Sequence, residues 1–483
     1  MDGRRLTQLL KDVDVAGGTV PNVPIEGVAY RSDRVHPGDV FFCVPGFRFD
    51  GHDFAADAVS RGAAALVCTR PLAIDAPQAV VRDVRKALAL ASARFYDEPT
   101  RELDVVGITG TNGKTTTTYL LESVLRAAGR RAGLVGTVET RVAGERLPAK
   151  HTTPESADLQ RLFRAMVDAD VDSVAMEVSS HAIDLHRVDG TRFAVAAFTN
   201  LTQDHLDYHH TLEEYWSVKR RLFTELDVGT RVVNLDDPRG AELARETDAQ
   251  VTVGRDPAAI VRALHERREG FSTTFDLVTP EGTATVHLPL IGAYNVSNAL
   301  VAAGAARPLG VSLEAIVAGL TTAPQVPGRL ERIDEGQAFG VFVDYAHTPD
   351  SLAKAIAAVR TVTSGRVITE FGCGGDRDPE KRSLMGAAAA AGSDEIVITS
   401  DNPRSEDPVG IILQVEDGVR GSGTSYVLEV DRRAGIARAL ALAAPGDSVL
   451  IAGKGHEDYQ IFADRTIHFD DREVAREELR SLC

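Results

Sequence analysis

Residues 107–115 read Gly107-Ile108-Thr109-Gly110-Thr111-Asn112-Gly113-Lys114-Thr115, and this stretch decides how the rest of the chain is interpreted. It follows a short apolar, β-branched run at 103–108, and apolar residues recur at helical spacing from 120 to 128. Glycines between a strand and a helix let backbone amides curl around phosphate oxygens, and the helix N-terminus adds partial positive charge. We therefore predict a phosphate-binding loop.

In such a loop Lys114 reaches the β- and γ-phosphates of a nucleotide, and the Thr115 hydroxyl ligates Mg²⁺. The usual spacing G-x-x-x-x-G-K-[ST] is not met, because Ile108 occupies its first glycine position. The alternative is a glycine-rich turn that merely joins strand to helix, but the strand–loop–helix context favours ATP. The predicted ATP-binding residues here are Gly110, Thr111, Asn112, Gly113, Lys114, Thr115 and Thr116.

Short apolar runs alternate with helical patterns on both sides of a hinge predicted at 325–328. This alternation is typical of mostly parallel sheets with helices on both faces. The runs before the hinge are 174–178, 194–198 and 231–233, and those after it are 341–343, 367–369, 395–399 and 448–452. We predict an α/β protein of three domains: a small N-terminal α/β domain (1–101), a central P-loop-type parallel sheet (102–327) and a C-terminal Rossmann-like α/β domain (328–483).

Composition narrows the class of protein. The 483 residues include 53 Lys+Arg and 70 Asp+Glu, a net charge of −17, which argues against nonspecific nucleic-acid binding and against attachment to anionic lipid. No run approaches the ~18–20 apolar residues of a membrane span, and no apolar signal core follows the first residues. The cysteines Cys43, Cys68, Cys373 and Cys483 show no metal-ligand spacing. We expect a cytoplasmic, monomeric protein with reduced thiols.

Polar residues follow the predicted strands, and in open parallel sheets ligands bind outside the carboxyl ends of the strands. Two such edges facing each other predict a cleft between domains. Near the phosphate loop, Glu177 ends a strand and His205 lies in a polar loop, so that both could hold Mg²⁺ together with Thr115. The alternatives are a capping or salt-bridging acid at Glu177 and a structural histidine at His205.

The loop spacing and five further motifs resemble the Mur ligase family, whose members use ATP to build the peptidoglycan stem peptide. The resemblance runs from about residue 30 to 470. Its other motifs are Glu177-Val178-Ser179-Ser180-His181, Asp204-His205-Leu206-Asp207-Tyr208-His209, Gly292-Ala293-Tyr294-Asn295-Val296-Ser297-Asn298-Ala299, Pro327-Gly328-Arg329 and Asp344-Tyr345-Ala346-His347-Thr348-Pro349-Asp350.

The resemblance implies roles that spacing alone does not give. It implies that Lys219 is carbamylated and supports a second metal ion, whereas the sequence alone favours a solvated lysine paired with Glu213 or Glu214. It implies that Asn295 contacts the nucleotide, the alternative being a helix N-cap. It implies that Arg329 and Asp344 contact phosphate and ribose. The expected catalytic residues are then Lys114, Glu177, His205 and Lys219.

The resemblance is closest to the members that add the third residue of the peptide, joining meso-2,6-diaminopimelate to UDP-N-acetylmuramoyl-L-Ala-D-Glu. It implies contacts with the UDP-substrate from Ser32, Thr152, Thr153, Ser179 and Arg187. The alternatives are an ordinary turn at Thr153 and a surface position for Arg187. Asp33 follows Ser32 where the family usually has arginine, so the uridine contacts differ in detail.

Selection of the amino acid can be argued physically. Diaminopimelate carries one carboxylate more than L-lysine, and arginine offers the planar, bidentate cation that recognises it. Arg404 follows a strand end and is the predicted ligand, with a surface ion pair to Glu406 as the alternative. The resemblance adds Arg377, Asp401, Asn402, Gly453 and Glu457, the last as acceptor for the distal ammonium.

Three other functions remain open at this point. A lysine-adding ligase would use the same ATP site, and folylpolyglutamate synthase usually continues its loop Gly-Lys-Gly-Ser rather than Gly-Lys-Thr-Thr. A P-loop ATPase or GTPase switch would hydrolyse nucleotide without an acceptor, with Glu177 as its acid.

Overall fold

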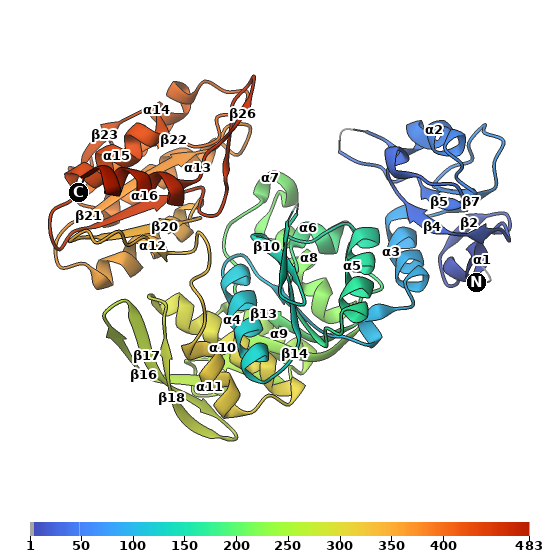
Figure 1. The fold of residues 1–483 in the computed structure, drawn as a ribbon, viewed down its shortest axis with the longest axis horizontal. Coiled ribbons are helices and arrows are strands. Elements are labelled where there is room, and N and C mark those ends of the chain that lie inside the picture. Colours follow the sequence, from blue (N-terminus) through green and yellow to red (C-terminus); the bar gives the residue numbers. More distant parts are fainter. Residues whose placement is uncertain (1–3, 48, 150, 483) are drawn as a thin grey trace.

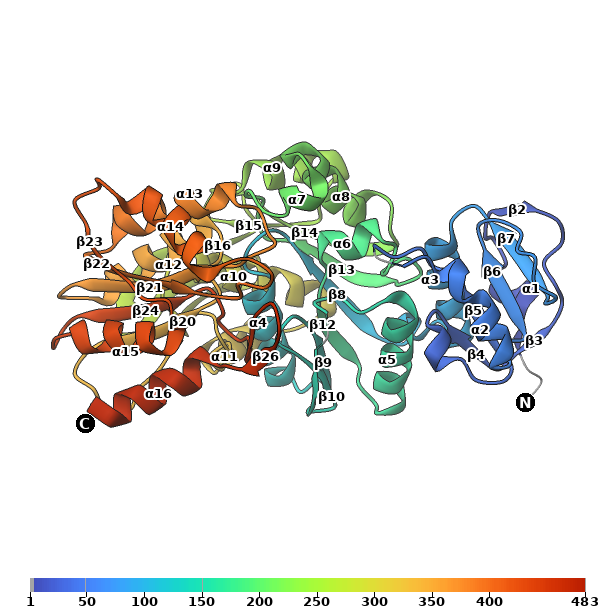
Figure 2. The ribbon, with the colours of Figure 1, turned by 90° about the horizontal axis from the view of Figure 1, so that it is seen from above.

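The computed structural model describes residues 4–47, 49–149 and 151–482. Its three main sheets occupy successive parts of the chain and form three lobes in a row, with the central lobe between the other two (Figure 1, Figure 2). The N-terminal sheet has strand order β2-β7-β6-β5-β4. Its strands are β2 (Val15–Gly17), β4 (Gly27–Ala29), β5 (Asp39–Phe42), β6 (Ala65–Cys68) and β7 (Gln78–Val81).

Strand β5 shows why the N-terminal sheet is covered on both faces. Val40 and Phe42 pack into one hydrophobic cluster, while Phe41 packs into the other, because successive side chains of a strand alternate. The first cluster includes α1 (Leu6–Leu9) and α3 (Val84–Phe95), and the second includes α2 (Ala55–Ser60). Tyr30 Oη donates to Asp158 at 2.6 Å and so ties this lobe to the central one.

The central sheet has strand order β11-β10-β9-β12-β8-β13-β14-β15-β16-β17-β18, and the strands from β9 to β16 in this order pair in parallel. β8 (Asp104–Thr109) lies in the middle and ends at the glycine-rich loop. The other strands are β9 (Ala132–Val135), β10 (Glu139–Val142), β11 (Glu145–Pro148), β12 (Ser173–Glu177), β13 (Phe193–Phe198), β14 (Val228–Asn234), β15 (Val251–Gly254), β16 (Val261–Glu269), β17 (Ser272–Thr279) and β18 (Gly282–Leu288).

Helices cover both faces of the central sheet (Figure 1). Val106 and Ile108 of β8 face α4 (Lys114–Ala127), α10 (Ala293–Ala306) and α11 (Leu313–Thr321), whereas Val105 faces the opposite cluster. The helices of that second cluster are α5 (Ser156–Asp168), α6 (Ser180–Asp184), α8 (Leu212–Thr224) and α9 (Pro238–Thr247).

The antiparallel arm β16–β18 extends one edge of the central sheet and was not anticipated from the sequence. At the turn of this arm, Phe271 lies 5.9 Å from the Phe342 ring of the C-terminal lobe, between ring centroids. The Arg332 guanidinium lies over the same Phe271 ring at 4.1 Å. The arm therefore contacts the C-terminal lobe through Phe271.

The C-terminal sheet has strand order β19-β20-β24-β21-β22-β23. Helices α12 (Pro349–Val362), α13 (Glu380–Gly392) and α14 (Pro408–Val419) cover one face, and α15 (Arg432–Leu442) and α16 (Asp471–Leu482) cover the other. The strands are β19 (Glu331–Arg332), β20 (Gly340–Asp344), β21 (Val367–Cys373), β22 (Glu395–Ser400), β23 (Ser425–Leu428) and β24 (Ser448–Ala452), followed by the hairpin β25 (Tyr459–Ile461) and β26 (Thr466–His468).

The α/β class predicted from the alternating pattern is confirmed, and every strand predicted after residue 100 is present. The boundaries proposed at 101 and 327 stay predictions. Within the described residues, no helix is both long and apolar enough to cross a bilayer. Cys43, Cys68 and Cys373 are buried free thiols, and Cys483 lies outside the described residues.

Candidate functional site

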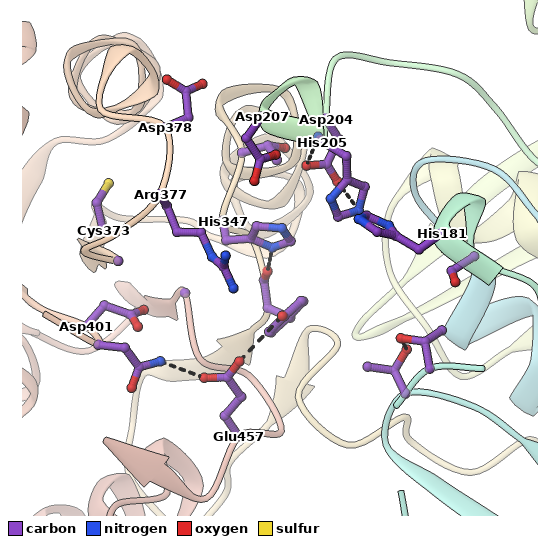
Figure 3. A pocket seen from close by; sticks show the side chains of 18 of the residues that line it. His181, Asp204, His205, Asp207, His347, Cys373, Arg377, Asp378, Asp401 and Glu457 are labelled. Carbon is purple, nitrogen blue, oxygen red and sulfur yellow. Dashed lines mark hydrogen bonds and ion pairs between the residues drawn. The ribbon is translucent and has the colours of Figure 1, made fainter. Parts of the chain in front are cut away.

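Two cavities meet where the carboxyl ends of the central and C-terminal sheets face each other, as the polar strand ends predict. The smaller cavity, of about 250 Å³, contains the glycine-rich loop. The larger cavity, of about 1080 Å³, has one wall on the central lobe and one on the C-terminal lobe. Figure 3 shows these walls, with His181, Asp204 and His205 facing Arg377, Asp401 and Glu457. The residues that line both cavities are Thr137, Thr152, Ser179, Asp204, His205, Tyr345 and His347.

The glycine-rich loop packs tightly against α10. Gly113 has φ +86°, and a Cβ there would lie 2.2 Å from Asn298 Oδ1, so only glycine fits. Lys114 begins α4, and its Nζ folds back to donate to the carbonyls of Gly110 (2.9 Å) and Thr111 (2.8 Å). Burial lowers the pKa of Lys114, although nearby carboxylates oppose this effect. The loop thus already surrounds a cation in the position of a phosphate-binding lysine.

Glu177, at the end of β12, connects the loop to the strand beside it. The carboxylate is 1% exposed and accepts from Thr137 N at 2.7 Å, Thr137 Oγ1 at 3.0 Å and Thr115 Oγ1 at 3.1 Å. Glu177 does not cap a helix through these hydrogen bonds. Glu177 instead holds the hydroxyl of the residue that follows the loop lysine.

His205 precedes the short helix α7 (Leu206–His209) in a left-handed conformation, with φ +54°. Its Nε2 lies 3.5 Å from Asp204 Oδ2, and its ring faces both cavities. Burial lowers the pKa of His205 to about 4 against the attraction of Asp204, and His181 and the two nearby lysines lower it further. The imidazole is therefore neutral at neutral pH, which is the form that binds metal ions.

Lys219 lies on α8 and is 1% exposed, which excludes the solvated lysine that the sequence alone favours. Its Nζ donates to the Gly110 carbonyl at 2.9 Å, the same oxygen that accepts from Lys114, and lies 4.5 Å from the Tyr215 ring. Glu213, one of the expected partners, pairs with Arg239 instead. Burial, and then repulsion by Lys114, lowers the pKa of Lys219 well below its usual value. This lysine is poised to lose its proton.

Arg329 crosses from the hinge region into the nucleotide side. Its Nη2 donates to Thr115 Oγ1 at 3.2 Å, and its guanidinium lies 4.4 Å from the Tyr345 ring. Asp344, at the end of β20, accepts from the Leu330 amide at 2.6 Å. Burial raises the pKa of Asp344 to about 6, against the attraction of Arg329.

Asn295 also lines the smaller cavity. Helix α10 begins at Ala293 after the cap residue Gly292, so the alternative of Asn295 as an N-cap is wrong. Its Nδ2 donates to the Ile291 carbonyl at 2.8 Å, and its Oδ1 accepts from Asn298 at 3.1 Å.

Four of the five residues predicted for the UDP-substrate lie together. Thr153 Oγ1 donates to the Glu177 carbonyl at 2.9 Å, and Arg187 Nη1 donates to the Thr153 carbonyl at 3.1 Å. Ser179 N donates to Thr153 Oγ1 at 3.2 Å. Thr152, Thr153, Ser179 and Arg187 all line the larger cavity, so Arg187 is not a plain surface residue. Ser32, in a 3-10 turn of the N-terminal lobe, lines neither cavity.

All six residues predicted for the amino acid line the larger cavity: Arg377, Asp401, Asn402, Arg404, Gly453 and Glu457. Asn402 Nδ2 donates to Glu457 Oε2 at 2.9 Å, a bond drawn in Figure 3. Gly453 allows close packing, since a Cβ there would lie 2.7 Å from an Asp401 carboxylate oxygen. Arg404 has φ +53°, a strained backbone for a residue with a side chain.

The expected alternative for Arg404 is wrong, because the Glu406 carboxylate pairs with Arg382 at 2.8 Å. Arg404 Nη1 instead donates to the Gly375 carbonyl at 2.7 Å. Arg404 lines the larger cavity, where its guanidinium can meet a ligand.

The sequence analysis missed several site residues, among them Phe47, Thr137, Tyr345 and Lys454. Phe47, 77% exposed, is the part of the N-terminal lobe that reaches the larger cavity, where its ring lies 5.9 Å from Tyr208. Thr137 had no motif to mark it. Tyr345 and Lys454 stand beside predicted residues within polar strand ends, which is the signal that could have found them.

Thr115, Glu177 and His205 fit a magnesium ion by donor chemistry. They offer a hydroxyl, a carboxylate and a neutral imidazole around the smaller cavity. Mg²⁺ usually takes one or two carboxylates and completes its shell with phosphate oxygens and water. The residues present therefore fit an ion that arrives together with a nucleotide.

Three family models match successive parts of the chain: "Mur ligase family, catalytic domain" at residues 24–96, "Mur ligase middle domain" at 108–306 and "Mur ligase, glutamate ligase domain" at 328–455. Two curated relatives are named UDP-N-acetylmuramoyl-L-alanyl-D-glutamate--2,6-diaminopimelate ligase. That of Geobacillus kaustophilus is 49% identical over 94% of this chain and 95% of its own, and that of Bacillus licheniformis is 45% identical over 99% of each. A solved structure of a ligase with the same name is 30% identical, with TM-score 0.71 over 99% of both chains. This chain belongs to the Mur ligase family.

Proposed function

We propose that this chain is the ATP-dependent ligase that adds meso-2,6-diaminopimelate to the D-glutamate of UDP-N-acetylmuramoyl-L-Ala-D-Glu, in cytoplasmic peptidoglycan precursor synthesis. The observation that supports this most directly is the junction of two chemically different cavities. A cavity that contains the loop lysine Lys114 and the hinge arginine Arg329, suited to a triphosphate, opens into a second cavity whose far wall holds Arg377, Arg404 and Glu457. An acid activated at the first can meet an amine held at the second.

In the first step, the γ-carboxylate of D-glutamate attacks the γ-phosphate of ATP, and ADP leaves. Lys114 and Arg329 flank Thr115 and offer positive charge to the phosphoryl group in transfer. Because Arg329 comes from the hinge region, this charge is completed only when the C-terminal lobe is close to the loop. Asn295 and Asp344 line the same cavity and are our proposed contacts to the nucleoside.

In the second step, the amine of diaminopimelate attacks the acyl phosphate, and inorganic phosphate leaves as the amide forms. Holding the two reactants in a productive orientation accounts for the rate enhancement, so no side-chain nucleophile is required. We assign the extra carboxylate to Arg404 and Arg377, and the distal ammonium to Glu457 with Asp401 and Asn402 nearby. Enclosure between the lobes limits hydrolysis of the acyl phosphate.

The metal and Lys219 are part of the same proposal. Thr115, Glu177 and His205 would hold Mg²⁺, which supplies charge neutralisation at the transferred phosphoryl group. The buried Lys219, with its lowered pKa, offers the unprotonated amine that reaction with CO₂ requires. A carbamate there would place an anion next to Lys114, whose Nζ donates to the same carbonyl as Lys219 Nζ.

The test is ADP release with UDP-N-acetylmuramoyl-L-Ala-D-Glu and ATP, with meso-diaminopimelate or L-lysine supplied in parallel. We expect turnover with diaminopimelate alone. Turnover with lysine alone would make this the lysine-adding ligase and would remove the role given to Arg404. Equal ADP release without either amine would favour an ATPase switch.

A further inference from the structure

Lys454 is a buried cation behind the wall of the larger cavity that holds Arg377, Arg404 and Glu457, here called the acceptor wall, and the proposed function leaves it without a role. It follows β24 and is 0% exposed. Its neighbours Gly453 and Glu457 line the larger cavity, but the Lys454 side chain lies behind that wall. A buried lysine is costly unless it is paired and hydrogen-bonded, so its partners indicate what it does.

The partners of Lys454 are three residues of the proposed amino-acid site. Its Nζ donates to Asn402 Oδ1 at 3.2 Å, and it lies 3.5 Å from Glu457 Oε2 and 4.0 Å from Asp401 Oδ1. The Tyr459 ring centroid lies 5.5 Å away. One ammonium therefore contacts residues from the loops after β22 and β24.

Without Lys454, two carboxylates would face each other in a largely enclosed space. Like charges at short range disfavour joint ionisation, and one of the pair then takes up a proton. Burial already raises the pKa of Glu457, and Asp401 raises it further, while Lys454 and Asn402 oppose both. Lys454 is thus the nearby positive charge that keeps Glu457 able to accept from an ammonium.

We propose that Lys454 is a positioning residue that balances Asp401 and Glu457 and orients Asn402, so that the acceptor wall presents ionised carboxylates to the amines of the amino acid. It does so without touching the substrate. The inference rests on the proposed function for the identity of that amino acid. The contacts with Asn402, Glu457 and Asp401 do not depend on it.

Arg377 and Arg404 line the same cavity as this cluster, and further charged and titratable groups near it come from four elements. Tyr345 Oη, after β20, donates to Glu457 Oε1 at 3.5 Å, and Tyr459 lies on β25. Behind the cluster, Glu370 on β21 and Arg432 on α15 form a buried ion pair at 3.4 Å. None of these groups supplies a second cation within bonding distance of Glu457 among the described residues.

The experiment compares Lys454→Met with Lys454→Arg in the full-length enzyme. Lys11, exposed in the N-terminal lobe, gives the matched control Lys11→Met. At about pH 7 we expect Lys454→Met to raise KM for diaminopimelate about 10- to 100-fold, and the increase should shrink toward about pH 9 as Glu457 ionises. KM for ATP and for the UDP-substrate should stay unchanged, Lys454→Arg should recover most of the loss, and Lys11→Met should match wild type.

Two results would overturn the inference. One is an unchanged pH profile of KM for diaminopimelate in Lys454→Met. The other is an equal loss for all three substrates at every pH, which is the result expected from damage to the fold. If Lys454→Met is too unstable to assay, Lys454→Gln gives the same pH comparison.

A titration without substrate separates this inference from the proposed function. The ¹³Cδ resonance of Glu457, identified by its loss in Glu457→Gln, should titrate at higher pH in Lys454→Met than in wild type. Wild-type enzyme that fails to use diaminopimelate would refute the proposed function, yet this titration would still decide the role of Lys454. An unchanged titration midpoint of Glu457 in Lys454→Met would refute the inference and leave the proposed function untouched.

Discussion

The nucleotide side and the acceptor side of the cleft are built in different ways. On the nucleotide side, one continuous loop carries Lys114 and Thr115, and Lys114 and the buried Lys219 share a single carbonyl oxygen, that of Gly110. On the acceptor side, the residues predicted to bind the amino acid come from three separate segments, at 377, 401–404 and 453–457. On the nucleotide side, Lys114 and Arg329 lie around Thr115, whereas on the acceptor side Lys454 lies close to the carboxylates of Asp401 and Glu457.

Buried ion pairs hold the acceptor side together. Arg382 and Arg432 are the two largest fully buried side chains of the described residues. Arg382 pairs with Glu406 at 2.8 Å, beside the loop of Arg404, and Arg432 pairs with Asp471 at 2.7 Å behind the strand ends. The comparison teaches that backbone geometry defines the nucleotide side and that charge pairing defines the acceptor side.

The largest effect should come from removing the loop lysine. Lys114→Ala should lower kcat by about 1000-fold or more, because the charge at the transferred phosphoryl group is lost. Binding of the UDP-substrate, measured by calorimetry, should persist, since its proposed contacts lie elsewhere. Normal ADP production by this variant would refute the assignment of the loop.

This difference also explains what the sequence could predict. Residues 107–115 determine a strand, a loop and a helix within one short stretch, so local spacing was enough to place Lys114 and Thr115. The alternating apolar runs likewise predicted β20, β21, β22 and β24, whose polar ends form the acceptor wall. Local sequence patterns therefore predicted the strand ends at both sheet edges.

Long-range contacts could not be predicted from local sequence patterns. Phe47 joins the larger cavity only because the N-terminal lobe folds toward Tyr208, and no local pattern encodes that approach. The left-handed conformation of Arg404 depends on tertiary contacts such as the hydrogen bond that its backbone N–H donates to the Ile461 carbonyl at 3.0 Å. Lys219, expected on the surface from its acidic neighbours, is buried because α8 packs against the glycine-rich loop.

The second-largest effect should come from Lys219. Replacing this residue tests whether Lys114 and Lys219 are both cations during turnover. Lys219→Met should lower kcat by about 100-fold, because the anion formed by carbamylation is lost. Depletion of CO₂ should lower wild-type activity, and bicarbonate should restore it. Enzyme incubated with ¹³C-bicarbonate should show a carbamate resonance that is missing from Lys219→Met. Full activity in CO₂-free buffer would remove carbamylation from the proposal.

Arg404→Lys tests the acceptor side with the positive charge kept. Lysine cannot reproduce the planar, bidentate contact with a carboxylate, so KM for diaminopimelate should rise about 10- to 100-fold while KM for ATP stays constant. The preference for diaminopimelate over L-lysine should fall by a similar factor. An exposed arginine of the same lobe, Arg465, provides Arg465→Lys as the matched control. An unchanged preference would assign the selecting contact to Arg377.

The smallest effect is a pH dependence on the nucleotide side, at the carboxylate of Asp344. Its pKa is raised to about 6 by burial, so KM for ATP should rise several-fold as the pH falls below this value and the ribose contact loses its charge. A raised pKa also means that the ionised form costs stability. The cost begins above about pH 4, where the unfolded chain ionises, and is complete above about pH 6.

Asp344→Asn separates the two consequences of that buried charge. The variant should be more stable than wild type above about pH 6 by about 1–2 kcal/mol, with no difference below about pH 4, as measured by urea unfolding across pH. Its KM for ATP should be raised and should no longer change between about pH 5 and about pH 7. A variant that binds ATP normally would show that Asp344 acts on the hinge through the Leu330 amide and not on the nucleotide. A variant less stable than wild type at neutral pH would show that the attraction between Asp344 and Arg329 outweighs the cost of burial.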